Sequence, residues 1–283
     1  MTAPRTALAA TPLPEQRHGS RLRTRDAFIG ALGPDLDPFL MVSLYEMRGP
    51  TFPPHPHAGF MVATYILPES EVGFVNQDSL GTHNRIPPGA LHVTLAGRGV
   101  LHEEQPEVEG LLAQGFQIWI DLPAALRESA PQALHLPAEA VPAVASPGVD
   151  VRVVLGAHQG QAAPLTLPTP VTLLDVTLAP GARWTHALAA SEHAFAFVLG
   201  GGVSLGPVGA VAGQLLRTRA EGEALTLQAG HEGARFTLFA GTPLRQPRAM
   251  QGPFVANDAH QLARFARDHA SGRFGSLTPM GAA

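Results

Sequence analysis

Short runs of β-forming residues recur along this chain, and turn signals separate them at close intervals. Residues 62–67, 72–75, 91–95 and 116–120 are rich in branched and aromatic side chains. Between these runs stand the turn-forming strings Asp78-Ser79-Leu80-Gly81, Pro87-Pro88-Gly89 and Gly97-Arg98-Gly99. Closely spaced strands with such punctuation are typical of a β-sandwich or β-barrel. The sequence therefore predicts an all-β fold.

The length of the chain allows one large domain or two ordinary ones, because it has 283 residues. A second β-rich region begins at Val149 and contains the runs 171–176 and 236–239, after a stretch rich in proline and alanine. We therefore expect two β domains in tandem. The expected boundaries are a mobile tail over residues 1–25, an N-terminal domain over 26–130, a linker over 131–148 and a C-terminal domain over 149–283.

One helix is predicted near the C-terminus, over residues 259–270. Asp258 is a good N-cap residue, Leu262 and Phe265 lie on one apolar face, and Gly272 follows as a stop. We expect this short helix to be an extension of the C-terminal domain, packed on a domain surface.

Composition excludes several classes of function. The formal net charge is −4 and no basic stripe is visible, so nucleic-acid binding is not expected. The chain has no cysteine, which excludes disulfides and thiolate metal sites. Residues 194–213 are uncharged, but glycines and Gly206-Pro207 interrupt them, which predicts a β-hairpin rather than a membrane span. The N-terminus lacks the unbroken apolar core of a secretory signal, so we expect a cytoplasmic protein without membrane contact.

Two short strings carry the strongest chemical signal, His55-Pro56-His57 and His102-Glu103-Glu104. Residues i and i+2 of a strand point to the same face, so His55 and His57 project together, as do His102 and Glu104. Glu103 points to the opposite face. If the two strings lie on neighbouring strands, three imidazoles and one carboxylate converge on one point.

Such a ligand set suits a transition metal with open coordination positions. Nitrogen and oxygen ligands without sulfur favour non-haem Fe(II), with manganese, nickel, copper and zinc as competitors. The alternative is that His55 and His57 belong to an exposed proline-rich loop and that His102 is a core or turn residue. Spacing alone leaves both interpretations open. It also leaves His92 open, either as a residue behind the metal ligands or as a core histidine.

The histidines of the second half show no comparable pattern. His186, His193 and His231 have no His-x-His string and no neighbouring His-x-Glu. We therefore expect no metal in the C-terminal domain.

Around these strings the sequence resembles the pirin family of the cupin superfamily. The resemblance in the first half runs through His55-Pro56-His57-Ala58-Gly59-Phe60, Gln77-Asp78-Ser79-Leu80-Gly81, Gly97-Arg98-Gly99-Val100-Leu101-His102-Glu103-Glu104 and Gln117-Ile118-Trp119-Ile120-Asp121-Leu122-Pro123. In the second half it runs through Ala240-Gly241-Thr242-Pro243-Leu244-Arg245-Gln246-Pro247 and Gly252-Pro253-Phe254-Val255-Ala256-Asn257. The motifs are long and keep their order over most of the chain.

The resemblance implies two tandem jelly-roll cupin barrels with one metal, held in the N-terminal barrel. Residue by residue, the implied ligands are His55, His57, His102 and Glu104, and the implied metal is iron. Some members are similar to quercetin 2,3-dioxygenases, which open a flavonol ring with dioxygen and release carbon monoxide. Others look like redox-responsive transcriptional cofactors.

Two departures from the family pattern affect the expected substrate rather than the ligands. Ala58 and Met61 stand where the family commonly has a basic and an acidic residue, and His92 and Val93 replace a glutamine and a large aromatic residue. The ligand strings themselves are intact.

Three functions remain as hypotheses. The first is a dioxygenase acting on a small aromatic, flavonol-like enol and dioxygen, in which Glu104 takes the proton of the substrate's hydroxyl group. The second is an iron-dependent redox sensor with a protein partner and no turnover. The third is a metal-assisted enzyme acting on a small acid or sugar. For the ligands, we predict that alanine at His57 or Glu104 removes most of the metal, whereas Glu103→Ala leaves the metal content nearly unchanged.

Overall fold

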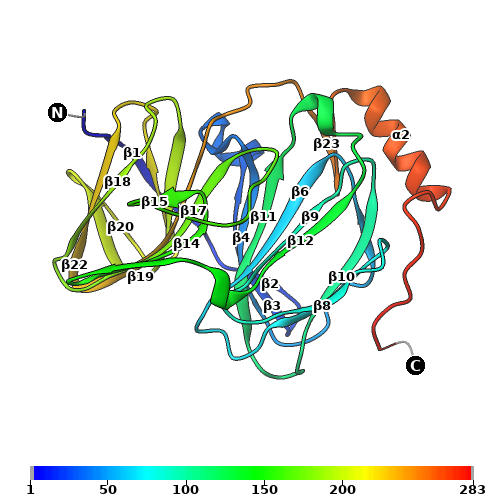
Figure 1. Cartoon of the computed structure of the whole chain (residues 1–283), viewed down its shortest axis with the longest axis horizontal. Coiled ribbons are helices and arrows are strands. Elements are labelled where there is room, and N and C mark those ends of the chain that lie inside the picture. The colour runs from blue at the N-terminus through cyan, green and yellow to red at the C-terminus, as the bar shows by residue number, and fades with distance from the viewer. Residues whose placement is uncertain (1–2, 282–283) are drawn as a thin grey trace. The chain divides into compact units, whose positions relative to one another are not determined.

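The computed structural model describes residues 3–281, which form two compact units. Unit 1 comprises residues 3–14, 27–38 and 140–243, and unit 2 comprises residues 15–26, 39–139 and 244–281. Antiparallel sheets form the framework of both units (Figure 1), which confirms the predicted all-β fold. Within the described residues, no helix is long and apolar enough to cross a membrane.

Unit 2 is a sandwich of two sheets. The strands of its seven-stranded sheet stand in the order β12 (Gln132–Leu136), β9 (Leu91–Leu95), β6 (Phe60–Ile66), β11 (Ala113–Asp121), β4 (Phe39–Met47), β3 (Leu22–Phe28) and β2 (Gln16–His18). Those of its four-stranded sheet stand in the order β5 (His55–His57), β10 (Val100–Pro106), β7 (Phe74–Asp78) and β8 (His83–Ile86). The predicted runs at 62–67, 91–95 and 116–120 thus coincide with β6, β9 and β11.

Strands β6 and β9 of the seven-stranded sheet are buried on both faces, and the two faces differ in chemistry. Register aligns Thr64 of β6 with His92 of β9 and Gln117 of β11, and these side chains face the four-stranded sheet. The alternate residues of the same strands, such as Val93 and Ile118, are apolar and almost fully buried. Alternation along these strands therefore places a polar patch in the interior of the sandwich, next to an apolar core that includes Ile66 and Phe74.

Unit 1 contains a nine-stranded sheet around a large apolar core. Seven strands stand in the order β1 (Ala7–Pro12), β21 (Gln214–Thr218), β19 (His193–Leu205), β22 (Ala224–Gly241), β17 (Val171–Leu178), β14 (Val149–Leu155) and β13 (Ala143–Ser146). Strand β18 (Arg183–Ala187) pairs with β22, β20 (Val208–Val211) pairs with β19, and β15 (Ala157–His158) pairs with β16 (Gln161–Ala162). The hairpin of β19 and β20 turns at Gly206 and Pro207, as predicted for residues 194–213.

The helices are few and short. Helix α1 (Ile29–Leu32) is followed by a 3-10 turn (Pro34–Leu36), and further 3-10 turns occupy Ala124–Leu126 and Ala138–Ala140. Helix α2 (Ala259–Ala270) has the predicted bounds. The carboxylate of Asp258 accepts the backbone N–H of Gln261 at 2.8 Å, which confirms the predicted N-cap.

Two segments that we expected to be irregular are ordered instead. Residues 3–25 contain β1, β2 and the start of β3, so the prediction of a mobile tail is wrong. In unit 1 the buried guanidinium of Arg5 donates to the carbonyls of Glu192 and Ala189, which ties this segment to its sheet. The expected linker, 131–148, contains β12 of unit 2 and β13 of unit 1. Backbone pairing of this kind depends on the neighbouring strand, so local composition does not reveal it.

The last part of the chain also departs from the expected boundaries. Residues 244–281 belong to unit 2, whereas we expected all of 149–283 in the C-terminal domain. This segment contains the β23 (Ala249–Gln251) and β24 (Phe254–Ala256) pair and α2, which contact one another (Figure 1). Phe265 of α2 is buried with Ala58 and Phe274. The chain thus returns to the unit that contains the His-Pro-His string.

Candidate metal centre

The two histidine strings lie on neighbouring strands of unit 2. Strands β5 and β10 are antiparallel, and their register sets His102 opposite His55 and Val100 opposite His57. Strand β5 is at the edge of its sheet. An edge position tolerates Pro56, because proline has no backbone N–H to donate to a neighbouring strand. The pairing that we inferred from the spacing of the strings is therefore present.

The three imidazoles form a compact cluster. The Nε2 atoms of His55 and His102 are 3.1 Å apart, and one nitrogen from each of His55, His57 and His102 lies within 4.8 Å of the others. His55 donates its Nδ1 hydrogen to the carbonyl of Pro53 at 2.9 Å, which leaves Nε2 as the nitrogen with a free lone pair. Two nitrogens bound at about 2.1 Å to one ion at right angles lie about 3.0 Å apart. The separation of these nitrogens fits such an ion.

Burial keeps these histidines neutral. His57 and His102 are 3% and 2% exposed. Desolvation lowers the pKa of both well below the usual value, and the neighbouring histidines lower it further. Desolvation also lowers the pKa of His55. Among the described residues, the Nδ1 atoms of His57 and His102 have no hydrogen-bond partner. Neutral, unsatisfied imidazole is the form that binds a metal.

Glu104 is adjacent to this cluster but is not one of its three members. It follows His102 by two residues on the same face of β10 and is 7% exposed. Its Oε2 accepts a hydrogen bond of 2.7 Å from the hydroxyl of Thr64. Burial raises the pKa of Glu104 to about 7, although the bond from Thr64 lowers it. The carboxyl group is therefore inside the sandwich, hydrogen-bonded across to the opposite sheet.

Glu103 lies on the opposite face of β10, as strand alternation predicts. It is 1% exposed, and its Oε2 accepts hydrogen bonds of 2.8 Å from the Gln77 side chain and the Met280 backbone. Because its partners come from β7 and from the C-terminal segment, this carboxylate is turned away from the histidine cluster.

Three residues near the cluster were not singled out as site residues from the sequence, and a fourth, His92, was left open. Thr64 and Gln117 come from the seven-stranded sheet, and the indole of Trp119 lies with its ring centre 5.7 Å from that of His57. His92 faces the same interior and accepts a bond of 3.4 Å from Asn76, so it is not an apolar core histidine. Strand alternation shows which residues share a face with Gln117. Only the register with the neighbouring strands shows that this face points into the sandwich.

The segment after the His-Pro-His string is held by β24. The backbone N–H of Ala58 donates to the carbonyl of Pro253, and the N–H of Val255 donates to that of Ala58. Gly59 has a φ of +84°, and a Cβ there would stand 1.7 Å from the carbonyl oxygen of Val255. Only glycine permits this close approach next to the ligand strand.

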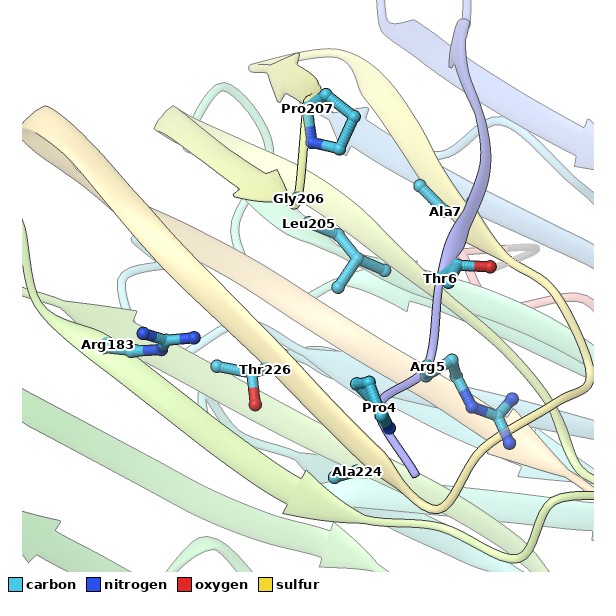
Figure 2. A pocket seen from close by; sticks show the side chains of 10 residues that line it. All are labelled: Pro4, Arg5, Thr6, Ala7, Arg183, Leu205, Gly206, Pro207, Ala224 and Thr226. Carbon is cyan, nitrogen blue, oxygen red and sulfur yellow. The ribbon is translucent and has the colours of Figure 1, made fainter. Parts of the chain in front are cut away.

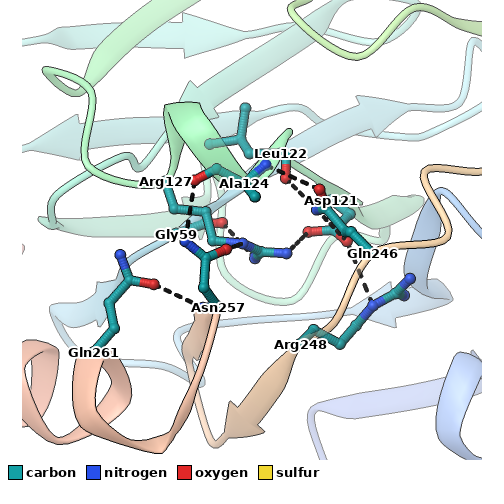
Figure 3. A network of polar contacts seen from close by, with 9 residues as sticks. All are labelled: Gly59, Asp121, Leu122, Ala124, Arg127, Gln246, Arg248, Asn257 and Gln261. Carbon is teal, nitrogen blue, oxygen red and sulfur yellow. Dashed lines mark hydrogen bonds and ion pairs between the residues drawn. The ribbon is translucent and has the colours of Figure 1, made fainter.

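A buried ion pair supports the same turn. Arg127 donates to the carbonyl of Gly59 at 3.0 Å and pairs with Asp121 at 2.7 Å, and both charged side chains are fully buried (Figure 3). Asn257 accepts from Arg127 at 2.9 Å, and Gln246 donates to Asp121 at 3.1 Å. The motif residues that we placed in the C-terminal domain therefore stabilise the unit that contains the histidine cluster.

A surface pocket in unit 1 offers a different chemistry. It has a volume of about 310 Å³ and is lined by the N-terminal segment Pro4, Arg5, Thr6 and Ala7 together with Arg183, Leu205, Gly206, Pro207, Ala224 and Thr226 (Figure 2). None of these ten lining residues is a histidine or a carboxylate. The pocket therefore lacks the kind of histidine cluster that lies in unit 2.

Comparison with known proteins agrees with this arrangement. The pirin family model matches residues 15–120, and the model of the pirin C-terminal cupin domain matches residues 173–275. The chain belongs to the pirin family. It is 34% identical over 249 residues to pirin-like protein 2 of Arabidopsis thaliana, covering 85% of this chain and 76% of that protein. The two units are thus two cupin domains, as the resemblance implied.

Two solved structures share this fold. Quercetin 2,3-dioxygenase from Acinetobacter baumannii is 26% identical, with a TM-score of 0.89 over 98% of this chain and 100% of that one. A pirin from Escherichia coli in complex with nickel(II) is 20% identical, with a TM-score of 0.64 over 83% of this chain and 98% of that one. The second likeness shows the fold alone.

Proposed function

We propose that this pirin-family protein is a non-haem Fe(II)-dependent dioxygenase acting on a flavonol-like enol such as quercetin. The observation that carries the proposal is the cluster of three neutral imidazoles, two of them buried, beside the Glu104 carboxyl group. The likeness to quercetin 2,3-dioxygenase from Acinetobacter baumannii supports the substrate class.

The residues present fit a divalent ion. We assign His55, His57, His102 and Glu104 as its ligands, because three neutral imidazoles bring one nitrogen each within 4.8 Å of one another and Glu104 lies beside them on the same face of β10. When bound, Fe(II) supplies Lewis acidity toward the enol and redox chemistry toward dioxygen.

The protein side of the mechanism centres on Glu104. Its Oε2 is engaged by Thr64, so we assign Oε1 to the metal and to the proton of the substrate's 3-hydroxyl group. Thr64 orients the carboxyl group for both roles. Burial of Glu104 excludes bulk water, which keeps the proton transfer between defined partners.

Aromatic side chains beside the ligands suit a flat, conjugated substrate. The ring centres of Phe60 and Trp119 are 4.7 Å apart, and both rings pack against His57. Planar aromatic groups pack well on such surfaces in offset or edge-to-face arrangements. Phe60 is fully buried, so Trp119, which is partly exposed, is the ring that we assign to contact with a flavonol substrate.

The test uses protein stripped of metal and reloaded anaerobically with Fe(II), or with Mn(II), Ni(II), Cu(II) or Zn(II). We expect quercetin to perturb the absorption spectrum before oxygen is admitted, and oxygen uptake with carbon monoxide release afterwards. Glu104→Gln should abolish turnover, whereas Glu109→Gln, which changes an exposed carboxylate of unit 2 away from the histidine cluster, is the control. Metal binding without any oxygen uptake over a panel of flavonols would overturn the activity but not the metal centre.

A further inference from the structure

The C-terminal segment after α2 runs along the outer face of the strand that bears His102 and Glu104. Phe274 fills the space that a side chain at Gly99 would need, because a Cβ there would stand 2.0 Å from its ring. Further on, the carbonyl of Thr278 accepts from the Gln77 side chain at 2.7 Å. The segment therefore covers the turn before β10 and continues to the neighbouring strand β7.

Glu103 is the point at which this segment reaches the ligand strand. Its carboxylate accepts the backbone N–H of Met280 at 2.8 Å and side-chain donors from Gln77 and Gln105. A carboxylate that is 1% exposed needs such donors, since burial without them is unfavourable. Glu103 is also the residue between His102 and Glu104, so any shift of its backbone moves both neighbours.

We propose that the segment after α2 positions the metal ligands of β10, and that Glu103 is the positioning residue through which it acts. The inference rests on the metal centre of the proposed function. Metal ligands must be held within about 0.5 Å of their working geometry, and residues behind them provide that support. Here the support comes from a part of the chain more than a hundred residues away from β10 in sequence.

This assigns a role to Glu103 that strand alternation alone did not. Alternation predicts that Glu103→Ala leaves the metal content nearly unchanged, and at saturating metal we still expect one ion per chain. We expect the affinity of Glu103→Ala for the metal to fall about 10-fold, as it does when other residues that position metal ligands are replaced.

The experiment removes one hydrogen bond at a time and measures the dissociation constant of Ni(II) by competition with a chelator. Met280→Pro removes the backbone N–H that Glu103 accepts, and Met280→Ala is the matched control that keeps it. We expect Met280→Pro and Glu103→Ala each to weaken Ni(II) binding about 10-fold and to shift its ligand-field absorption bands. Met280→Ala should match the wild type, and Glu103→Gln should restore part of the loss.

The double variant Glu103→Ala/Met280→Pro should bind Ni(II) as Glu103→Ala does, because both changes break the same link. Wild-type affinity and spectrum in both single variants would overturn the inference. An additional tenfold loss in the double variant would overturn the assignment to Glu103. If His57→Ala leaves Ni(II) binding intact, the metal centre itself fails, which is a separate outcome. Melting of the metal-free proteins, followed by circular dichroism, shows whether each variant folds.

Discussion

The molecule contains two buried clusters of histidine, one in each unit, and they differ in how their ring nitrogens are satisfied. In unit 1 the Nδ1 atoms of His158 and His186 are 3.0 Å apart, and the indole of Trp184 donates to His158 Nε2 at 3.1 Å. In unit 2 the Nδ1 atoms of His57 and His102 have no hydrogen-bond partner within residues 3–281.

The hydrogen bonds in unit 1 define a single arrangement of protons. Because Trp184 donates to Nε2 of His158, that ring carries its hydrogen on Nδ1 and donates it to His186. The pair lies beside an apolar core that includes Trp184 itself. A buried histidine pair can thus be complete without a ligand. The cluster of unit 2 differs from this pair in its third imidazole and in the carboxyl group of Glu104 beside it.

The largest expected difference between the clusters concerns metal affinity. His57→Ala removes one proposed ligand and should weaken Ni(II) or Fe(II) binding by more than about 100-fold, beyond the effect of changing a residue behind the ligands. His186→Ala should leave the affinity and the stoichiometry unchanged. Elemental analysis and chelator competition measure both. Comparable metal loss in the two variants would remove the distinction between the clusters.

A second difference concerns stability at low pH. Burial and His158 lower the pKa of His186 to about 4, from 6.5. The unfolded chain then takes up a proton that the folded chain does not, so stability decreases as the pH falls below about 6.5 and levels off near 4. Between pH 6.5 and 5 the loss from this group is at most about 2 kcal/mol.

Replacing His186 with glutamine should flatten this part of the pH profile, because glutamine does not titrate and can accept the bond from His158. Trp184 is in unit 1 and Trp119 is in unit 2, so in a Trp119→Phe background tryptophan fluorescence reports on unit 1 alone. Urea unfolding at pH 7.5, 6 and 5 gives the profile. If the free energy of unfolding depends on pH in the glutamine variant as it does in the wild type, the His158–His186 pair does not cause this pH dependence.

The smallest expected effect concerns the hydrogen bond from Thr64 that orients the carboxyl group of Glu104 in unit 2. Thr64→Val removes the hydroxyl that donates to Glu104, and should lower metal affinity and turnover about 10-fold, or about 1.4 kcal/mol. Thr64→Ser keeps the hydroxyl and should retain most of both. If valine and serine behave alike, the hydrogen bond does not orient Glu104.

Part of this site was predictable because it depends on local periodicity. The strands at 62–67, 91–95 and 116–120, the helix over 259–270 and the opposite directions of Glu103 and Glu104 all follow from patterns within a few residues. The register that sets His102 opposite His55 was a conditional expectation, which the pairing of β5 with β10 confirms. The assignment of the four residues as ligands stays a proposal.

Other features depend on partners distant in sequence and were missed for that reason. Residues 3–25 have the composition of a tail, but β1 pairs with β21, about two hundred residues along the chain, and β2 pairs with β3. Asn257 and Gln246 were recognised as motif residues, yet nothing near them in the sequence indicates that they bind Arg127 and Asp121.

By itself, the sequence determined the all-β class, the histidine strings and the face on which each side chain projects, because strand alternation is a property of the backbone. Only the tertiary structure decided that the chain returns after Pro243 to the unit of the histidine cluster, and that Met280 reaches Glu103. The physical reason is that burial and hydrogen bonding of a segment are satisfied equally well by near and distant partners, so sequence position does not select between them.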